Sequence, residues 1–173
     1  MIYLREICQN DLNTINKWRN NSELIASLES PFRYINFETD KNWFENYMHN
    51  RTNNVRCIIC SGDNHDDIIG SIGLLNIDPI NKKADFYLMI GDKKNQGKGI
   101  GHQATMQIIQ HAFLNLNLNR VQLTVLENNE RAIKLYEKVG FKKEGIQRQS
   151  VYKNGKYIDL ILMSILKDEF VNK

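Results

Sequence analysis

The chain has 173 residues, a length that suits one domain with a sizeable hydrophobic core, and we expect residues 1–173 to form a single domain. Its formal net charge of +3 at pH 7 is small and its basic residues form no block, so nothing points to nucleic acid as a partner. The N-terminus turns polar at once, and no apolar run approaches the roughly 18 residues of a membrane span. We therefore expect a cytoplasmic protein with no membrane partner.

The N-terminal third is predicted to hold one strand followed by helices. Apolar residues first alternate and then recur at helical spacing. Pro31 closes the second helix, because the residue before a proline avoids the helical region. The expected elements are a strand over residues 2–7, a helix opening at Asp11, a short helix capped by Ser22 and running to Leu28, and a helix starting at Thr39 or Asp40.

From Val55 the pattern changes to strands joined by short turns, which predicts an antiparallel meander. Gly140 is placed to end a later helix as a C-cap, and Asn154-Gly155 is a strong hairpin signal. The expected ranges are strands at 55–61, 68–77 and 84–90, a helix from Gly99, a strand at 120–126, a helix capped by Asn128 or Asn129, and strands at 141–152 and 156–166.

This order of elements predicts an α+β (mixed α/β) protein with a central mixed, mostly antiparallel sheet of six to seven strands and helices on both faces. Cys57 and Cys60 fall three apart in a predicted strand, so their thiols should point to opposite faces. We therefore expect free core cysteines of a reducing compartment, and no metal.

The stretch most informative about function is a glycine-rich turn between a hydrophobic strand and an amphipathic helix. It has the sequence Gln96-Gly97-Lys98-Gly99-Ile100-Gly101. Glycines let the backbone approach a ligand closely, and free N–H groups at a helix N-terminus favour a phosphate. Lys98 adds a full charge, so the turn predicts an anion site. A glycine-rich turn can also simply end a strand.

Two common nucleotide-binding motifs do not fit this turn. The NTPase loop needs Ser or Thr after its Lys, but Gly99 follows Lys98. The dinucleotide fingerprint would need Gly or Ala at His102. What remains is Gln-x-x-Gly-x-Gly at Gln96, Gly99 and Gly101. Here the sequence resembles the GNAT superfamily of acyl-CoA-dependent N-acyltransferases, whose pyrophosphate-binding motif is Gln/Arg-x-x-Gly-x-Gly/Ala.

A second segment, residues 129–141, closely resembles the GNAT pattern Asn-x-x-Ala-x-x-Leu-Tyr-x-x-x-Gly-Phe. The resemblance implies that Asn129 contacts the cofactor and that Tyr136 is the general acid for the departing CoA sulfur. A tyrosine stays protonated at pH 7 because its reference pKa is about 10, and positioned acids typically contribute about 10²–10⁴-fold. The alternative for Tyr136 is a packing aromatic beside the apolar face of its helix.

The resemblance also implies roles for the strand at residues 84–90. The strand is expected to splay from its parallel neighbour at 120–126, and a bulge is expected to free its main chain for the pantetheine arm. Asp85 is the first candidate for the base that deprotonates the amine, with a solvated strand-end carboxylate as the alternative. The implied acetyl-CoA site comprises Leu88, Met89, Ile90, Gln96, Gly97, Lys98, Gly99, Ile100, Gly101, Asn129 and Tyr136.

In this fold, residues 21–48 usually shape the acceptor pocket. The segment holds carboxylates suited to a polycation and aromatic rings suited to a sugar or peptide groove; its candidate substrate-binding residues are Glu29, Tyr34 and Glu38. Glu29 and Glu38 are also weaker candidates for the base, together with Glu127.

The C-terminal half resembles the branch of ribosomal-protein N-terminal and spermidine or diamine acetyltransferases. We therefore expect acetyl transfer to a polyamine, diamine or other small primary amine. A protein N-terminus or an amino sugar comes next. An acyl-CoA-binding sensor without turnover is the alternative from another class, and the family resemblance is compatible with a homodimer.

Overall fold

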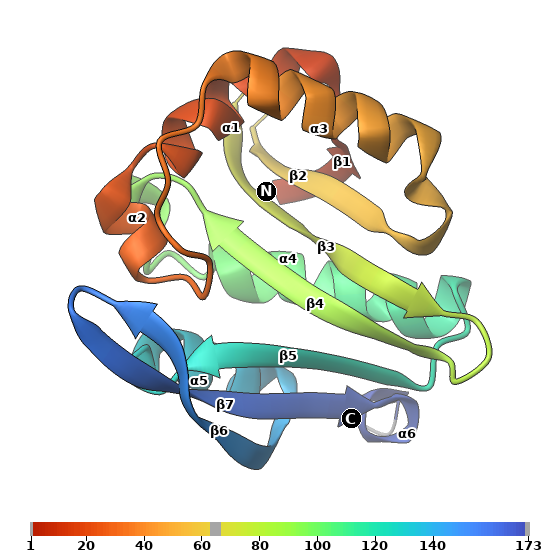
Figure 1. The fold of residues 1–173 in the computed structure, drawn as a ribbon. Coiled ribbons are helices and arrows are strands. Elements are labelled where there is room, and N and C mark those ends of the chain that lie inside the picture. Colours follow the sequence, from red (N-terminus) through yellow and green to blue (C-terminus); the bar gives the residue numbers. More distant parts are fainter. Residues whose placement is uncertain (1, 63–66, 172–173) are drawn as a thin grey trace.

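The computed structural model describes residues 2–62 and 67–171. Within these residues a seven-stranded sheet runs through the molecule in the order β1-β2-β3-β4-β5-β7-β6 (Figure 1). Every neighbouring pair is antiparallel except β4 and β5. The expected mixed sheet is confirmed. The strands are β1 (Ile2–Glu6), β2 (Val55–Ser61), β3 (Ile68–Asp78), β4 (Lys83–Ile90), β5 (Arg120–Leu126), β6 (Lys142–Lys153) and β7 (Lys156–Leu166).

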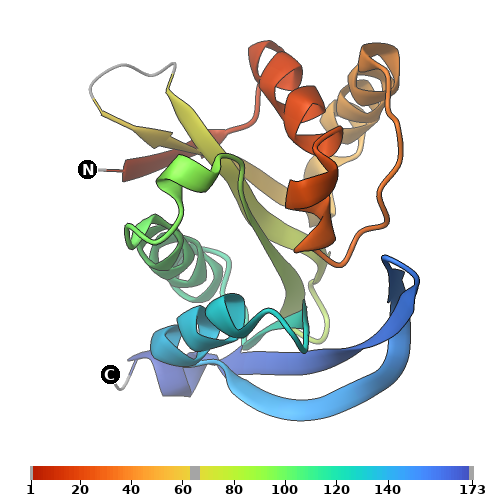
Figure 2. The same cartoon turned by 90° about the vertical axis from the view of Figure 1, so that its left-hand side faces the viewer.

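Helices cover both faces of the sheet, as Figure 2 shows, with the red and orange helices on one side and the green and blue-green helices on the other. The helices are α1 (Leu12–Arg19), α2 (Ser22–Ala26), α3 (Phe37–His49), α4 (Ile100–Gln110), α5 (Glu130–Val139) and α6 (Lys167–Val171). Residues from α4 and α5 pack into the larger core cluster, and residues from α1, α2 and α3 pack into a second cluster on the opposite face. No helix in the described ranges is long and apolar enough to cross a membrane.

Three predicted helix boundaries were wrong, and in two of them an asparagine cap explains the shift. Asn21 rather than Ser22 caps α2, accepting the N–H groups of Glu23 and Leu24, and α2 ends at Ala26 instead of Leu28. Asn36 accepts the N–H of Thr39 at 2.9 Å, so α3 starts two residues before Thr39. The cap of α2 therefore lies one residue earlier than expected, and α3 begins two residues before the earlier of its two expected starts.

As expected, Asp11 is the N-cap residue at which α1 opens, although its side chain makes no capping hydrogen bond to this helix. Its carboxylate accepts the Cys8 N–H at 2.8 Å and forms an ion pair with Arg5 at 2.7 Å, which fixes a 3₁₀ turn over Gln9–Asp11 before α1 begins. The Arg5 guanidinium holds the pKa of Asp11 below its usual range, against the opposing effect of burial. The separation of Cys57 and Cys60 is confirmed, since the two lie in clusters on opposite faces of the sheet and both are free thiols.

Gly91, directly after β4, leaves the space that the Trp18 ring fills. A Cβ added there would lie 1.9 Å from Trp18 Cε2, and the Gly91 N–H donates to the Ile69 carbonyl at 2.8 Å. We expect Gly91→Ala to lower the free energy of unfolding by about 1–3 kcal/mol, the usual cost of overpacking a filled core. Gly145→Ala on β6 is the control, because no atom lies within 4 Å of a Cβ there, and its effect should stay within about 0.5 kcal/mol. Urea denaturation measures both, and equal midpoints would contradict the prediction.

Candidate active site

The site begins where β4 and β5 separate. The two strands pair only over Lys83–Asp85 and Arg120–Gln122. Beyond these residues β4 continues along β3 and β5 continues along β7, so the strands diverge, as Figure 1 shows. The expected splay is confirmed. The expected bulge in β4 is wrong: its register with β3 is continuous from Asp85 to Ile90, and the irregularity lies in β3 between Leu75 and Asp78.

Two cavities meet at this separation. The first, the loop cavity, has a volume of about 430 Å³ and lies between β4, β5 and the segment 27–35 that follows α2. The second, the glycine-turn cavity, has a volume of about 380 Å³ and lies between the end of β4, the glycine turn and α5. Ser27, Leu88 and Tyr136 line both cavities. A molecule that spans the two would therefore pass these three residues.

Leu88, Met89 and Ile90 alternate between the two cavities, as successive residues of a strand should. Met89 lines the loop cavity, Ile90 lines the glycine-turn cavity, and Leu88 lines both. All three are partly buried. The structure thus places the predicted strand residues next to the glycine turn.

The three glycines of the turn are needed for different physical reasons. Gly97 and Gly99 adopt φ angles of 81° and 79°, in the left-handed region that favours glycine, and Gly99 is the N-cap of α4. Gly101 is needed for packing, because a Cβ there would lie 2.9 Å from Leu135 Cδ1 on α5. The first two glycines shape the turn, and the third lets α4 and α5 approach each other.

Gln96 holds the turn to its neighbours. Its amide nitrogen donates to the Ile90 carbonyl at 3.4 Å, and its amide oxygen accepts from Arg131 at 3.0 Å. Lys98 and Ile100 are outside the lining of the cavity, and Lys98 is exposed.

The positive charge at this cavity comes from α5. Its basic residues along the wall are Arg131, Lys134 and Lys138. Sequence reasoning missed them, although their spacing of three and four residues marks one helix face. The free N–H groups of the α4 N-terminus and these cations together suit a phosphate-bearing ligand.

Asn129 connects the two halves of the site. Its side-chain oxygen caps α5 by accepting the Ala132 N–H at 3.2 Å, and its amide nitrogen donates to the Ser27 carbonyl at 3.0 Å. The position expected from the sequence is therefore both a helix cap and a contact to the segment after α2.

Tyr136 stands where the two cavities join. Its side chain is only 7% exposed, and the rings of Phe86 and Phe141 pack on it with centroids 5.8 Å away. Burial raises the pKa of its hydroxyl above the ordinary value, so the group holds its proton at neutral pH. The packing that holds the ring also preserves the proton.

The structure does not bring Asp85 to the cavities. Its carboxylate accepts from Asn76 and from Gln122, each at 2.8 Å, in the paired part of β4 and β5. Glu38 is exposed with Lys41 3.9 Å away, and Tyr34 is 91% exposed; neither lines the loop cavity or the glycine-turn cavity. Of the expected acceptor residues, Glu29 alone lines the loop cavity.

The end of α2 and the first residues of the segment after it are bound to the C-terminal half of the chain. Glu29 accepts from the Thr124 hydroxyl at 2.5 Å. Lys153 on β6 donates its ammonium protons to the carbonyls of Ile25, at 3.1 Å, and Ser30. Lys153 is 8% exposed, and burial lowers its pKa. Sequence reasoning missed Lys153, because a lysine beside a hairpin turn has no pattern that marks it as buried.

The family profile described as an acetyltransferase (GNAT) domain matches residues 4–162. A spermidine N(1)-acetyltransferase of Vibrio cholerae is 29% identical over 171 residues, covering 98% of this chain and 95% of that protein. A putative ribosomal N-acetyltransferase of Bacillus subtilis is 39% identical over 103 residues, covering 60% of this chain and 56% of that protein. The crystal structure of a Vibrio cholerae spermidine N-acetyltransferase in complex with CoA and spermine superposes with a TM-score of 0.92, at 27% identity and with 99% and 98% of the two chains covered.

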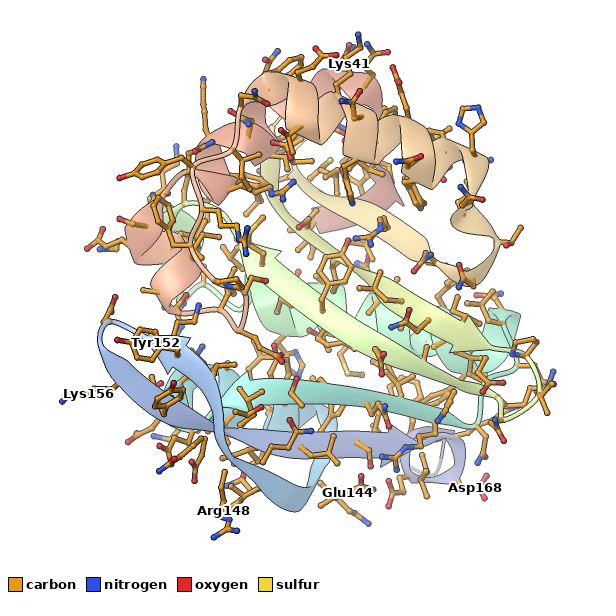
Figure 3. All side chains as sticks on the ribbon, viewed as in Figure 1. Lys41, Glu144, Arg148, Tyr152, Lys156 and Asp168 are labelled. Carbon is orange, nitrogen blue, oxygen red and sulfur yellow. The ribbon has the colours of Figure 1, made fainter. Side chains whose placement is uncertain are left out.

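Removing the buried ammonium of Lys153 should loosen the segment after α2. We expect Lys153→Met to lower the free energy of unfolding by about 1–3 kcal/mol, because it leaves two carbonyls without their donor. Lys156→Met is the matched control, since Lys156 is exposed at the tip of the same hairpin (Figure 3), and should change stability by less than about 0.5 kcal/mol. Chemical denaturation of both variants is the measurement, and an unchanged Lys153→Met midpoint would show that the contact contributes nothing.

Proposed function

Because the chain belongs to the acetyltransferase (GNAT) family, we propose that it transfers the acetyl group of acetyl-CoA directly to the nitrogen of a small primary amine. The observation that carries the proposal is the position of Tyr136, a protonated hydroxyl on the wall between two cavities. One cavity has the features of a phosphate site, and the other is open to a second substrate.

The residues around the glycine turn fit acetyl-CoA. A Cβ at Gly99 would meet nothing within 4 Å, so the backbone faces open space. The α4 N–H groups and the α5 cations supply donors and charge for a diphosphate. Lys98 and Ile100 would contribute through their main chain. The residues that we propose to hold the cofactor are Leu88, Met89, Ile90, Gln96, Gly97, Lys98, Gly99, Ile100, Gly101, Asn129 and Tyr136.

When bound, acetyl-CoA supplies an activated acyl group as a thioester. We propose that the diverging strand β4 places this group at Leu88, where a main-chain N–H stabilises the carbonyl oxygen as it gains charge. Tyr136 donates its proton to the sulfur that departs. Glu29 lines the loop cavity, and we propose it, in place of Asp85, as the carboxylate that receives the proton of the amine, directly or through water.

Similarity to the relatives makes a polyamine the first acceptor to test. The Vibrio cholerae protein acts on spermidine by its name, and it matches this chain over nearly all of its length. A protein N-terminus, as in the partial match to the ribosomal enzyme, and an amino sugar are the next acceptors. A cofactor sensor without turnover remains the alternative from another class, and turnover separates it from an enzyme.

Tyr136→Phe tests the enzyme directly. It keeps the ring that packs between Phe86 and Phe141 and removes the hydroxyl, so we expect kcat to fall about 10²–10⁴-fold with little change in the KM for acetyl-CoA. The measurement is release of free thiol from acetyl-CoA in the presence of a panel of amines. Tight CoA binding with no thiol release from the parent protein for any amine would favour the sensor.

The pH dependence should come from the acceptor and not from Tyr136. Because burial raises the pKa of Tyr136 above its reference of about 10, the hydroxyl keeps its proton through the alkaline range. We expect kcat/KM to rise with pH as the amine loses its proton, and to show no fall below about pH 10. A descending limb near pH 8 that vanished in Tyr136→Phe would show that this hydroxyl titrates much lower than its burial implies.

A further inference from the structure

The loop cavity carries more positive than negative charge. Three arginines line it, namely Arg19, Arg33 and Arg56, together with a single carboxylate, that of Glu29. This balance is unexpected for a cavity that receives a polycation. The three guanidinium groups differ in whether a carboxylate of the protein neutralises their charge.

Arg19 is paired within the protein. Its guanidinium donates to Asp40, whose side chain is fully buried and also accepts from Asn16 at 2.7 Å. By contrast, among the described residues neither Arg33 nor Arg56 forms an ion pair with a carboxylate. Two positive charges at the cavity wall therefore remain without a counter-charge from that part of the chain.

Arg56 is held in place by aromatic rings. Its Cζ atom lies 5.1 Å from the ring centroid of Trp43, 5.6 Å from that of Tyr47 and 5.7 Å from that of Tyr87. Gly73 on β3, the register partner of Arg56, makes room for this cage, because a Cβ there would lie 2.7 Å from the Tyr87 ring. The rings hold the guanidinium in place by cation–π contacts, and these contacts do not neutralise its charge as a carboxylate would.

One donor of Arg56 is left over. Its Nε is buried and has no hydrogen-bond partner in the described structure. A buried N–H without a partner costs about 1–3 kcal/mol, and such groups call for an explanation. The Arg56 side chain lines the loop cavity, and a guanidinium fixed on a cavity wall without a carboxylate partner is the arrangement that binds a carboxylate or phosphate through charge-assisted hydrogen bonds.

We propose that Arg56 and Arg33 form an anion subsite in the loop cavity, so that the acceptor of this chain is a primary amine that also carries a carboxylate or a phosphate. The inference rests on the proposed acetyl transfer and narrows its substrate. Arg56 holds the anion from the rigid sheet, and Arg33 reaches it from the segment after α2. Glu29 then faces the amine end of the same molecule.

The subsite also positions the reacting amine. With the anion held by Arg33 and Arg56, the amine end of the same molecule is placed for attack on the acyl group. A tricationic polyamine would meet the same groups as repulsion, at a cost that grows with each of its charges.

The test compares amines with and without an anion, and kcat/KM is calculated on the concentration of neutral amine, because the anion also changes the pKa of the amino group. Thiol release from acetyl-CoA is measured for glycine against glycinamide, for glucosamine 6-phosphate against glucosamine, and for spermidine. We expect the anionic member of one pair to have a kcat/KM at least about tenfold above its neutral match, the size of one charge-assisted hydrogen bond. A higher kcat/KM for glycine than for glycinamide would indicate a carboxylate site, and a higher kcat/KM for glucosamine 6-phosphate than for glucosamine would indicate a phosphate site.

Variants assign the effect to the subsite. Arg33→Gln and Arg56→Gln should each lower kcat/KM for the anionic amine about tenfold and leave the neutral match and the KM for acetyl-CoA unchanged. Arg33→Lys should recover part of the loss. Arg148→Gln, on β6 and pointing outward at the lower edge of Figure 3, is the charge-matched control and should have no effect.

Two outcomes overturn the inference while the proposed function stands. One is a kcat/KM for spermidine above that of every anionic amine; the other is an equal loss on both members of a pair in Arg33→Gln. If no thiol is released from acetyl-CoA with any amine, the proposed function fails. A binding measurement then tests whether the anion subsite exists. With CoA saturating, inorganic phosphate or acetate should raise the Tm of the parent protein more than that of Arg33→Gln, and equal shifts would refute an anion subsite.

Discussion

The separation of β4 from β5 after three paired residues is the constraint on which the site depends. A continuous ladder would bury Leu88 between neighbouring strands and fill the space where the two cavities meet. Each strand keeps its hydrogen bonds on the outer side, β4 to β3 and β5 to β7, so the sheet stays ordered on both sides of the opening. Main-chain groups on the inner side are thus available to a ligand, in the way that an exposed sheet edge accepts an added strand.

The segment after α2 turns this opening into an enclosed site. Its last residue, Ile35, is held by Asn16 and Asn20 in the N-terminal half of the chain. Its earlier polar contacts go to β5, to the N-terminus of α5 and to β6, through Thr124, Asn129 and Lys153. Asn129 illustrates the coupling, because one amide caps the helix that carries Tyr136 and also holds the wall of the loop cavity. The helix that carries Tyr136, the glycine turn and the wall of the loop cavity are therefore linked by hydrogen bonds through Asn129 and Arg131.

Much of this was accessible from the sequence, for identifiable reasons. The strand patterns and turn signals predicted β2, β5 and β7 with their observed bounds. The two motifs predicted that Gln96 and Tyr136 belong to the candidate site. Helix starts at Asn21 and Asn36 were missed because a cap is set by one side chain outside the apolar pattern. Asp85 was expected at the site because related sequences often carry an acidic residue at the entrance of this strand, but it lies in the paired part of β4, and its amide partners occupy both its oxygens. Lys153 and Arg56 gave no signal, since their burial depends on elements distant in the chain.

The charged side chains of the loop cavity carry information about the acceptor that the similarity of the backbone fold does not give. A TM-score of 0.92 to a spermidine acetyltransferase shows that the two chains share a backbone fold, but a backbone does not choose between a polycation and a zwitterion. We propose that groups such as Arg56 make this choice; its cage of Trp43, Tyr47 and Tyr87 comes from α3 and β4. Aromatic rings can hold a guanidinium without neutralising it, so they keep its field directed at the cavity. A carboxylate in the same place would cancel that field. On this physical ground we propose that the acceptor of this chain follows from the counter-charges of its cavity more closely than from its fold.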